Sequence, residues 1–186
     1  MKIVRIFVSG DGEDGLWAAQ FAGQAENEFS RFLKHTSDVS WLRSFFIDNA
    51  DDLCSGYFGK ISKERAVSKT LDEAIEMKTM LYDYWKLGCL KQGECLQYIF
   101  RPLNNYEFLI SLHQKTKARL RGSWLRIYAI RISENCFVIT GGAIKLTSDM
   151  RRAHLQIELR KLEKVKAFLQ KEGVVFPEDL KTFQDE

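Results

Sequence analysis

The chain has 186 residues, of which 45% are hydrophobic and 28% charged, with only two prolines. This length and composition are typical of one compact domain with a sizeable core, and they exclude an intrinsically disordered protein. The first apolar stretch is interrupted by Arg5, and no run reaches the roughly 18 apolar residues of a membrane span. We therefore expect a cytoplasmic protein that does not enter a membrane.

Positive charge is concentrated in the second half of the chain, although the formal net charge is only +3. Residues 101–166 hold 14 Lys or Arg against 5 Asp or Glu, whereas residues 1–100 hold 12 against 15. No acidic residue occurs between Phe108 and Ser133. A local field of this kind attracts a polyanion or an acidic protein. The six basic residues of this stretch are Lys115, Lys117, Arg119, Arg121, Arg126 and Arg131.

The four cysteines lie at positions 54, 89, 95 and 136, without C-x-x-C spacing. Reduced and mostly buried thiols are the expectation for such a pattern. The cysteine spacing therefore predicts no metal site.

The chain begins with residues 2–9, which alternate and are rich in Ile and Val, and which predict a strand. A glycine-rich turn follows over residues 10–15. Apolar residues then recur at spacings of three and four, which predicts a helix from Asp14 or Gly15 to about Lys34.

The glycine-rich turn matches the G-x-G-x-x-G fingerprint of dinucleotide-binding proteins. Its three acidic residues would repel a pyrophosphate at a helix N-terminus, where they instead favour the positive end of the helix. More helix, not a second strand, is predicted after the first helix, so the βαβ unit is missing. No glutamate closes a twelve-residue calcium loop from Asp11. We therefore expect neither a nucleotide cofactor nor any other cofactor.

Further helices are predicted up to about residue 87. Ser37 or Asp38 is expected to cap a second helix, and residues 51–57 read as a short helical turn. The T-x-x-E pattern at 70–73 is a capping box, which predicts a long helix over about 70–87. The first half is therefore expected to be one strand followed by helices.

The second half is predicted to contain strands. Residues 124–132 and 137–146 are dense in Ile, Val and aromatic residues and are separated by a three-residue turn signal, which predicts a β-hairpin. Shorter strands are predicted at 96–100 and 106–112. Paired glycines at 141–142 indicate a bulge or a close approach of another group to the second hairpin strand.

A final helix is expected to be capped by Ser148 or Asp149 and to end near Gly173, with a stripe of leucines and one valine along it. The stripe is compatible with both a core and a dimer interface, so the oligomeric state is left open. The order of strand, helices, antiparallel strands and helix belongs to the α+β class. Alternation along the first hairpin strand places Trp124, Arg126, Tyr128 and Ile130 on one face, and Leu125, Ile127 and Ala129 on the other.

The hairpin and the helix after it resemble the RelE/ParE superfamily of bacterial toxins, most closely its HigB and phage-derived branch. Those proteins carry an Arg-hydrophobic-x-Tyr strand and then a strand close to hydrophobic-His-Gly-Phe-hydrophobic-Lys-Lys-Thr. Arg126 matches the strand arginine, Gly142 the glycine, Lys145 the first lysine and Thr147 the threonine. The resemblance covers roughly residues 96–169.

The resemblance implies a small antiparallel sheet flanked by helices, with a basic concave face that binds mRNA in the ribosome and cleaves it without a metal ion. It also implies a single domain over residues 1–175 with an enlarged helical part over about 10–95, followed by a tail at 176–186. Cleavage needs cations for the phosphate and an acid and a base for the 2′-hydroxyl and the 5′-oxygen. The candidate catalytic residues are Arg126, Tyr128, Lys145 and His154.

Further basic residues are candidates for binding RNA, and His113 is a candidate for the same surface. The chain departs from the toxin pattern, since Gly141 replaces the histidine, Leu146 replaces the second lysine, and no Tyr or His follows the last helix. A solvated loop over 115–121 and an Arg126 paired with an acidic helix remain open alternatives. The RNA-binding candidates are Lys115, Lys117, Arg119, Arg121, Arg131, Arg151 and Arg152.

Three hypotheses follow from these observations. The chain is a toxin-like endoribonuclease that a small antitoxin protein neutralises, or it has the same fold and binds RNA or the ribosome without cleavage. In the third hypothesis, the basic residues between Phe108 and Ser133 bind an acidic protein.

Overall fold

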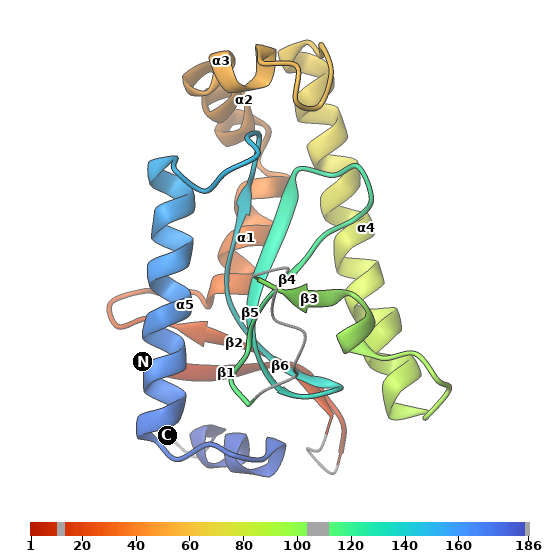
Figure 1. Cartoon of the computed structure of the whole chain (residues 1–186), viewed down its shortest axis with the longest axis vertical. Coiled ribbons are helices and arrows are strands. Elements are labelled where there is room, and N and C mark those ends of the chain that lie inside the picture. Colours follow the sequence, from red (N-terminus) through yellow and green to blue (C-terminus); the bar gives the residue numbers. More distant parts are fainter. Residues whose placement is uncertain (11–13, 104–111, 185–186) are drawn as a thin grey trace.

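The computed structural model describes residues 1–10, 14–103 and 112–184. A six-stranded sheet forms its centre, in the order β1-β2-β6-β5-β4-β3 (Figure 1). Strands from both halves of the chain therefore share one sheet. The strands are β1 (Lys2–Val8), β2 (Gly15–Gln20), β3 (Phe100–Pro102), β4 (Lys115–Ala118), β5 (Leu125–Ser133) and β6 (Cys136–Ile144).

The α+β class is confirmed, although the sheet is mixed. Neighbouring strands are antiparallel except for β2 and β6, which pair in parallel. The helices are α1 (Glu28–Ser37), α2 (Val39–Asp48), α3 (Ala50–Cys54), α4 (Lys63–Cys89) and α5 (Ala153–Lys171), with 3-10 turns η1 (Leu96–Tyr98) and η2 (Pro177–Gln184).

The helix predicted from Asp14 or Gly15 is wrong in its first part. That segment is strand β2, which lies between β1 and β6 with Leu16 to Ala19 fully buried. A strand covered on both sides reads as a continuous apolar run instead of alternating, so its pattern is easily taken for a helix. Helix α1 begins only at Glu28, where the side chain of Asn27 accepts a hydrogen bond from the Ser30 amide.

Helix α2 begins as predicted, because the Asp38 carboxylate accepts hydrogen bonds from the amides of the first turn. The predicted capping box at 70–73 is wrong, since α4 begins eight residues earlier with Ser62 as its cap. Thr70 instead donates to the Ala66 carbonyl and accepts from Trp124 Nε1, while Glu73 accepts from the Ser123 hydroxyl. These two polar residues tie α4 to the start of β5.

The β5–β6 hairpin is confirmed, and the described strands before it lie at other positions than the sequence predicted. Residues 96–100 form η1 and the start of β3, while most of the strand predicted at 106–112 lies outside the described residues. Residues 115–118, for which a solvated loop remained open, form β4. The predicted caps Ser148 and Asp149 are wrong, because α5 begins at Ala153, with Arg152 at its N-cap.

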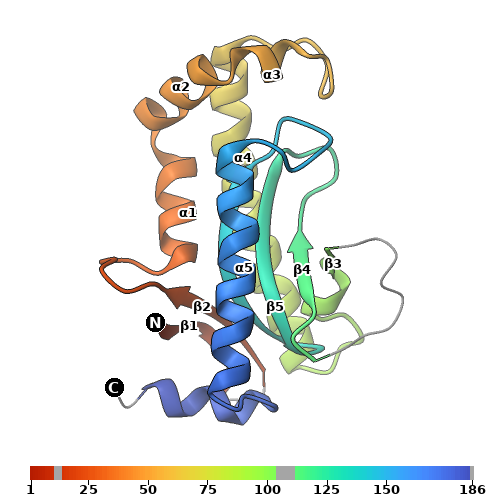
Figure 2. The same ribbon diagram turned by 60° about the vertical axis from the view of Figure 1, so that its left-hand side comes forward.

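Helices cover both faces of the sheet (Figure 2). Helices α1, α2 and α4 pack on the face that carries Leu125, Ile127 and Ala129, and α5 packs on the face of Tyr128 and Ile130. The predicted alternation is thus confirmed for β5 itself. It is wrong for Trp124, which precedes the strand and packs with Leu125.

The chain closes with η2, which lies against β1 and buries Leu180 completely. In the described part of the chain, no helix is both long and apolar enough to cross a bilayer.

Candidate functional site

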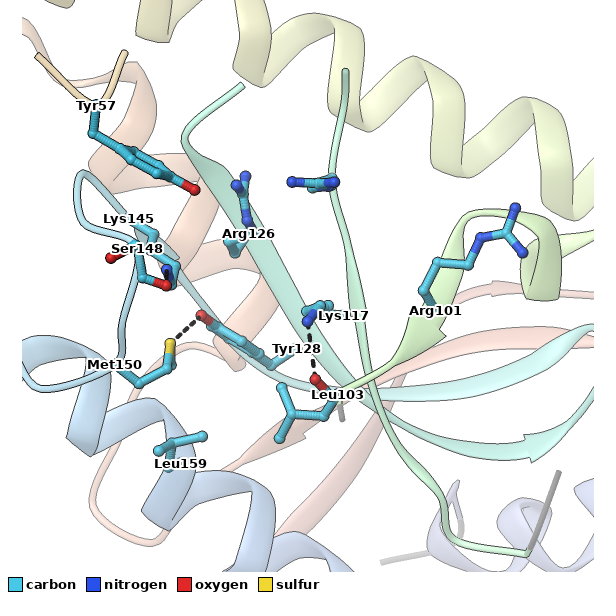
Figure 3. A pocket seen from close by; sticks show the side chains of 11 residues that line it. Tyr57, Arg101, Leu103, Lys117, Arg126, Tyr128, Lys145, Ser148, Met150 and Leu159 are labelled. Atoms are coloured by element: carbon cyan, nitrogen blue, oxygen red, sulfur yellow. Dashed lines mark hydrogen bonds between the residues drawn. The ribbon is translucent and has the colours of Figure 1, made fainter. Parts of the chain in front are cut away.

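A cavity of about 470 Å³ opens on the α5 face of the sheet (Figure 3). Its walls come from β3, β4, β5, α5, the loop after α3 and the loop between β6 and α5. We call it the basic cavity, because no Asp or Glu is among its described lining residues. Five cations line it, namely Arg101, Lys117, Arg119, Arg126 and Lys145.

The strand register explains how these distant residues meet. Arg101 of β3 pairs with Lys117 of β4, and Lys117 pairs with Tyr128 of β5. Directly paired residues share a face of the sheet, although the Arg101 side chain turns away from Lys117 (Figure 3). Arg126 lies on the same face one step along β5, and Lys145 follows the end of β6. Arg101, Lys117 and Tyr128 therefore lie in one row across three strands, although they span 28 positions of the sequence.

Arg126 is the most deeply placed cation, with 5% of its surface exposed. Its Nη1 donates to the Ser123 carbonyl at 2.7 Å and to the Leu125 carbonyl. Within the described residues, its guanidinium forms no ion pair. Burial, followed by repulsion from Arg119, lowers its pKa. A charge that is desolvated and unpaired favours the arrival of an anion.

The two lysines of the basic cavity are held by backbone carbonyls. Lys117 Nζ donates to the Leu103 carbonyl at 2.9 Å, and Lys145 Nζ donates to the Ser148 carbonyl at 2.8 Å. Burial lowers the pKa of both lysines, and Arg126 lowers both further. Each lysine therefore gives up its proton more readily than an exposed lysine does, which suits general acid or base chemistry.

Two tyrosines complete the polar lining. The buried Tyr128 hydroxyl donates to Met150 Sδ at 3.6 Å, and burial raises the pKa of this phenol. It therefore stays protonated and acts as a hydrogen-bond donor, not as a base. Tyr57 is 53% exposed and directs its hydroxyl toward Arg126 (Figure 3).

Sequence reasoning missed Tyr57 and Arg101. Tyr57 lies in the loop after α3, between Gly56 and Gly59, which have φ angles of +84° and +81°. An exposed aromatic residue between glycines was the available signal. Arg101 lies outside the acid-free stretch and joins the cavity only through the pairing of β3 with β4.

His154 does not reach the basic cavity. Its Nε2 lies 3.0 Å from the Ile144 carbonyl oxygen, and its ring packs edge-on against Phe45. It lines a second cavity, of about 240 Å³, between α1, α2, β6 and α5. The prediction that His154 belongs with Arg126, Tyr128 and Lys145 is therefore wrong, because residue 154 faces the other side of α5.

Four predicted RNA-binding residues also lie outside the basic cavity. Lys115 pairs with Glu163 of α5 at 2.7 Å, and Arg152 pairs with Asp52 of α3, also at 2.7 Å. Arg151 and Arg121 are exposed and do not line the basic cavity. Of the predicted binding residues, Lys117 and Arg119 do line it.

Arg131 and His113 are placed differently again. Arg131 lines a third cavity beside β3, and its buried Nε finds no hydrogen-bond partner in the described part of the chain. His113 is buried and has a φ angle of +55°, and burial lowers its pKa. Neither residue contributes to the basic cavity.

The second cavity contains charges of both signs, and we call it the paired cavity. Glu28 Oε1 lies 2.8 Å from Arg31 Nη1, and Lys161 Nζ lies 2.6 Å from Glu28 and 2.7 Å from Glu158. Glu158 Oε2 is buried, and no described residue forms a hydrogen bond with it. Burial raises the pKa of Glu158 to about 7.

The glycines at 141–142 make room for these groups, as predicted. A Cβ on Gly141 would overlap the Glu158 carboxylate, and one on Gly142 would overlap the Phe32 ring. The strand register also shifts between Tyr128 and Ala129, opposite this part of β6.

Comparison of the chain with protein-family models, curated proteins and solved structures gave no match. The described residues contain no group of three or more His, Cys, Asp or Glu placed to hold a metal ion. In chemical terms, the basic cavity can bind an anion through several cations at once, and burial lowers the pKa of two of those cations.

Proposed function

We propose that the basic cavity binds the phosphodiester backbone of RNA and that the protein is the toxin-like component of a toxin–antitoxin pair, acting as a metal-independent mRNA endoribonuclease. One observation carries this proposal: five cations and no described acidic residue line a single cavity. Arg126 is the buried member of this group, and a buried cation is usually paired with a carboxylate because an unpaired buried charge is costly. A phosphate would supply the missing negative charge.

The chemistry of the cluster suits a phosphodiester. Arginine forms bidentate hydrogen bonds with phosphate oxygens, and Arg119 acts electrostatically on Arg126. Binding an anion would relieve the repulsion between these cations. It would also raise the lowered pKa values of Lys117 and Lys145 again.

Cleavage would follow from attack of the 2′-oxygen on the adjacent phosphorus. The bond from phosphorus to the 5′-oxygen breaks, leaving a 2′,3′-cyclic phosphate and a 5′-hydroxyl. A protonated lysine gives a proton to the leaving 5′-oxygen, and the other lysine takes the proton of the 2′-hydroxyl once it has released its own proton to solvent; Lys117 and Lys145 are the candidates. Arg126 stabilises the charge that develops on the phosphoryl oxygens.

The second candidate function is RNA binding without cleavage. It is favoured by the absence of any histidine from the described lining of the basic cavity and by the raised pKa of Tyr128. The same positive surface would also attract an acidic segment of an antitoxin, which would compete with RNA for the cavity.

Inducible expression tests the proposal, with and without the genomic neighbour that would encode a small antitoxin. We expect growth arrest that the neighbour relieves. Arg126→Gln and Lys145→Met should each abolish the arrest, whereas Tyr128→Phe should weaken it by removing one hydroxyl. Arg121→Ala is the matched control, since Arg121 is exposed, lies in the same acid-free stretch and does not line the cavity.

Binding by the purified protein separates the two candidates. RNA affinity should fall steeply with salt, with a slope of about −0.7 per phosphate contacted on a single strand. Salt-dependent binding without cyclic-phosphate products would support the binding-only function. A flat salt response, or arrest that persists in the Arg126→Gln, Lys145→Met double variant, would overturn the assignment of this cavity.

A further inference from the structure

A cavity of about 230 Å³ lies beside β3, at the edge of the sheet. We call it the edge cavity. Arg101 lines both the edge cavity and the basic cavity, so the two adjoin. Figure 3 shows the Arg101 side chain pointing away from Lys117 and Tyr128. Strand β3 has only three residues and ends the sheet order, so a bound chain can pass from one cavity to the other over a short strand.

The lining of the edge cavity combines cations, an aromatic ring and side-chain amides. Arg101 and Arg131 supply positive charge, and no Asp or Glu is found among the residues described as lining it. Tyr98, at the end of η1, is 47% exposed. Gln97 and Gln114 supply the amides. Proteins that bind single-stranded nucleic acid use this combination, because rings stack on bases while cations hold phosphates.

Arg131 gives this cavity a buried polar group without a partner. Its Nε is enclosed and has no hydrogen-bond partner among the described residues, and burial lowers the pKa of its guanidinium. Glu134 is the acidic residue that acts on Arg131 electrostatically, and it does not line the cavity. A bound anion would therefore add a charge partner that the cavity itself lacks.

We infer that the edge cavity is a second nucleotide subsite for the RNA whose phosphate occupies the basic cavity. This inference rests on the proposed function and adds its substrate class: a single strand several nucleotides long that crosses β3. The base stacks on Tyr98, and Arg101 and Arg131 hold the flanking phosphate. A base in a duplex is already paired and stacked, so its face is not available to Tyr98.

Oligonucleotide length provides the test. Fluorescence anisotropy would measure the binding of a trinucleotide and of an octanucleotide, both 2′-O-methylated so that neither is cleaved. The wild-type protein should bind the octamer more tightly than the trimer. Tyr98→Ala should weaken octamer binding about tenfold, the loss expected for one base–aromatic stack, and leave trimer binding unchanged. Tyr98→Trp should keep the octamer affinity because it keeps a stacking ring.

Two further variants complete the experiment. Arg131→Gln should reduce the salt slope of octamer binding by about 0.7, the value for one phosphate contact on a single strand. Phe176→Ala is the matched control, because Phe176 is an exposed aromatic residue that lines neither cavity and should leave both affinities unchanged.

The outcomes distinguish the subsite from the proposed function. If the wild-type protein binds trimer and octamer equally well and in a salt-dependent way, the basic cavity stands and the edge subsite is overturned. Equal weakening of both lengths by Tyr98→Ala also overturns it, because that result indicates a change in the fold or in the basic cavity. Absence of RNA binding by the wild-type protein overturns both proposals.

Discussion

The basic cavity and the paired cavity lie on either side of α5 and both contain Arg and Lys side chains, yet these cations have different partners. In the paired cavity, Arg31 and Lys161 each lie within 3 Å of a carboxylate oxygen. In the basic cavity, Arg126 and the two lysines donate to backbone carbonyls instead. A carbonyl satisfies a hydrogen bond but does not neutralise a charge. The first arrangement is complete within the chain, whereas the second favours an anion from outside.

The largest expected effect comes from removing one charge from the ion pairs of the paired cavity. Glu28 is 2% exposed and pairs with both Arg31 and Lys161. Glu28→Gln removes the charge at constant size and should lower the free energy of unfolding by about 3 to 4 kcal/mol, as expected when one partner of a buried ion pair is lost. Urea denaturation measures this.

Arg126→Leu is the counterpart in the basic cavity. It removes a cation that repels Arg119, although two carbonyls lose their donor. The free energy of unfolding should therefore change by only about 1 kcal/mol. Equal destabilisation by the two substitutions would contradict the proposed difference between the cavities.

The pH dependence of stability gives a somewhat smaller effect. Burial raises the pKa of Glu158 from 4.5 to about 7. The folded chain therefore holds this proton more tightly than the unfolded chain does. The stabilisation that Glu158 contributes is fully present below about pH 4.5 and is lost as the pH rises to about 7. The free energy of unfolding changes by about 3 kcal/mol over this range.

Urea denaturation between pH 4 and pH 8 would measure this loss. Glu158→Gln should flatten the profile over that range, since it has no proton to exchange. Arg121→Ala should leave the profile unchanged. An unchanged slope in Glu158→Gln would show that another group carries the pH dependence.

A further substitution tests the packing of the paired cavity against β6. A Cβ at position 141 would overlap the Glu158 carboxylate, so Gly141→Ala should destabilise the fold by about 1 to 3 kcal/mol. RNA binding in the basic cavity should persist at temperatures where the variant is folded. Gly10→Ala is the control, because nothing lies within 4 Å of a Cβ there, and thermal unfolding compares the two. Equal melting temperatures would disprove the close contact.

Local pattern was sufficient where local interactions decide the structure. The β5–β6 hairpin, the Asp38 cap and the shared face of Arg126 and Tyr128 were all predicted from neighbouring residues. The glycines at 141–142 were predicted to permit a close approach, but not which groups approach. Those groups are Glu158 and Phe32, which are distant in sequence and come together only in the packed fold.

Errors arose where distant contacts outweigh local preference. Residues 16–19 are buried between two strands that the local pattern does not reveal, and Thr70 is an interior helical residue because α4 already begins at Lys63. Helical spacing likewise could not decide which side of α5 His154 would occupy. The candidate site consequently lost His154 and gained Tyr57 and Arg101.

Charge and strand alternation are properties of the chain, so the gathering of positive charge in the second half and the shared strand face of Arg126 and Tyr128 could be predicted from the residues alone. Which cations stay unpaired depends on the packed fold. Lys115 and Arg152 meet carboxylates from α5 and α3, whereas the cations of the basic cavity meet none among the described residues. The reason is physical: an ion pair depends on distance in space, and strand register and helix packing set that distance.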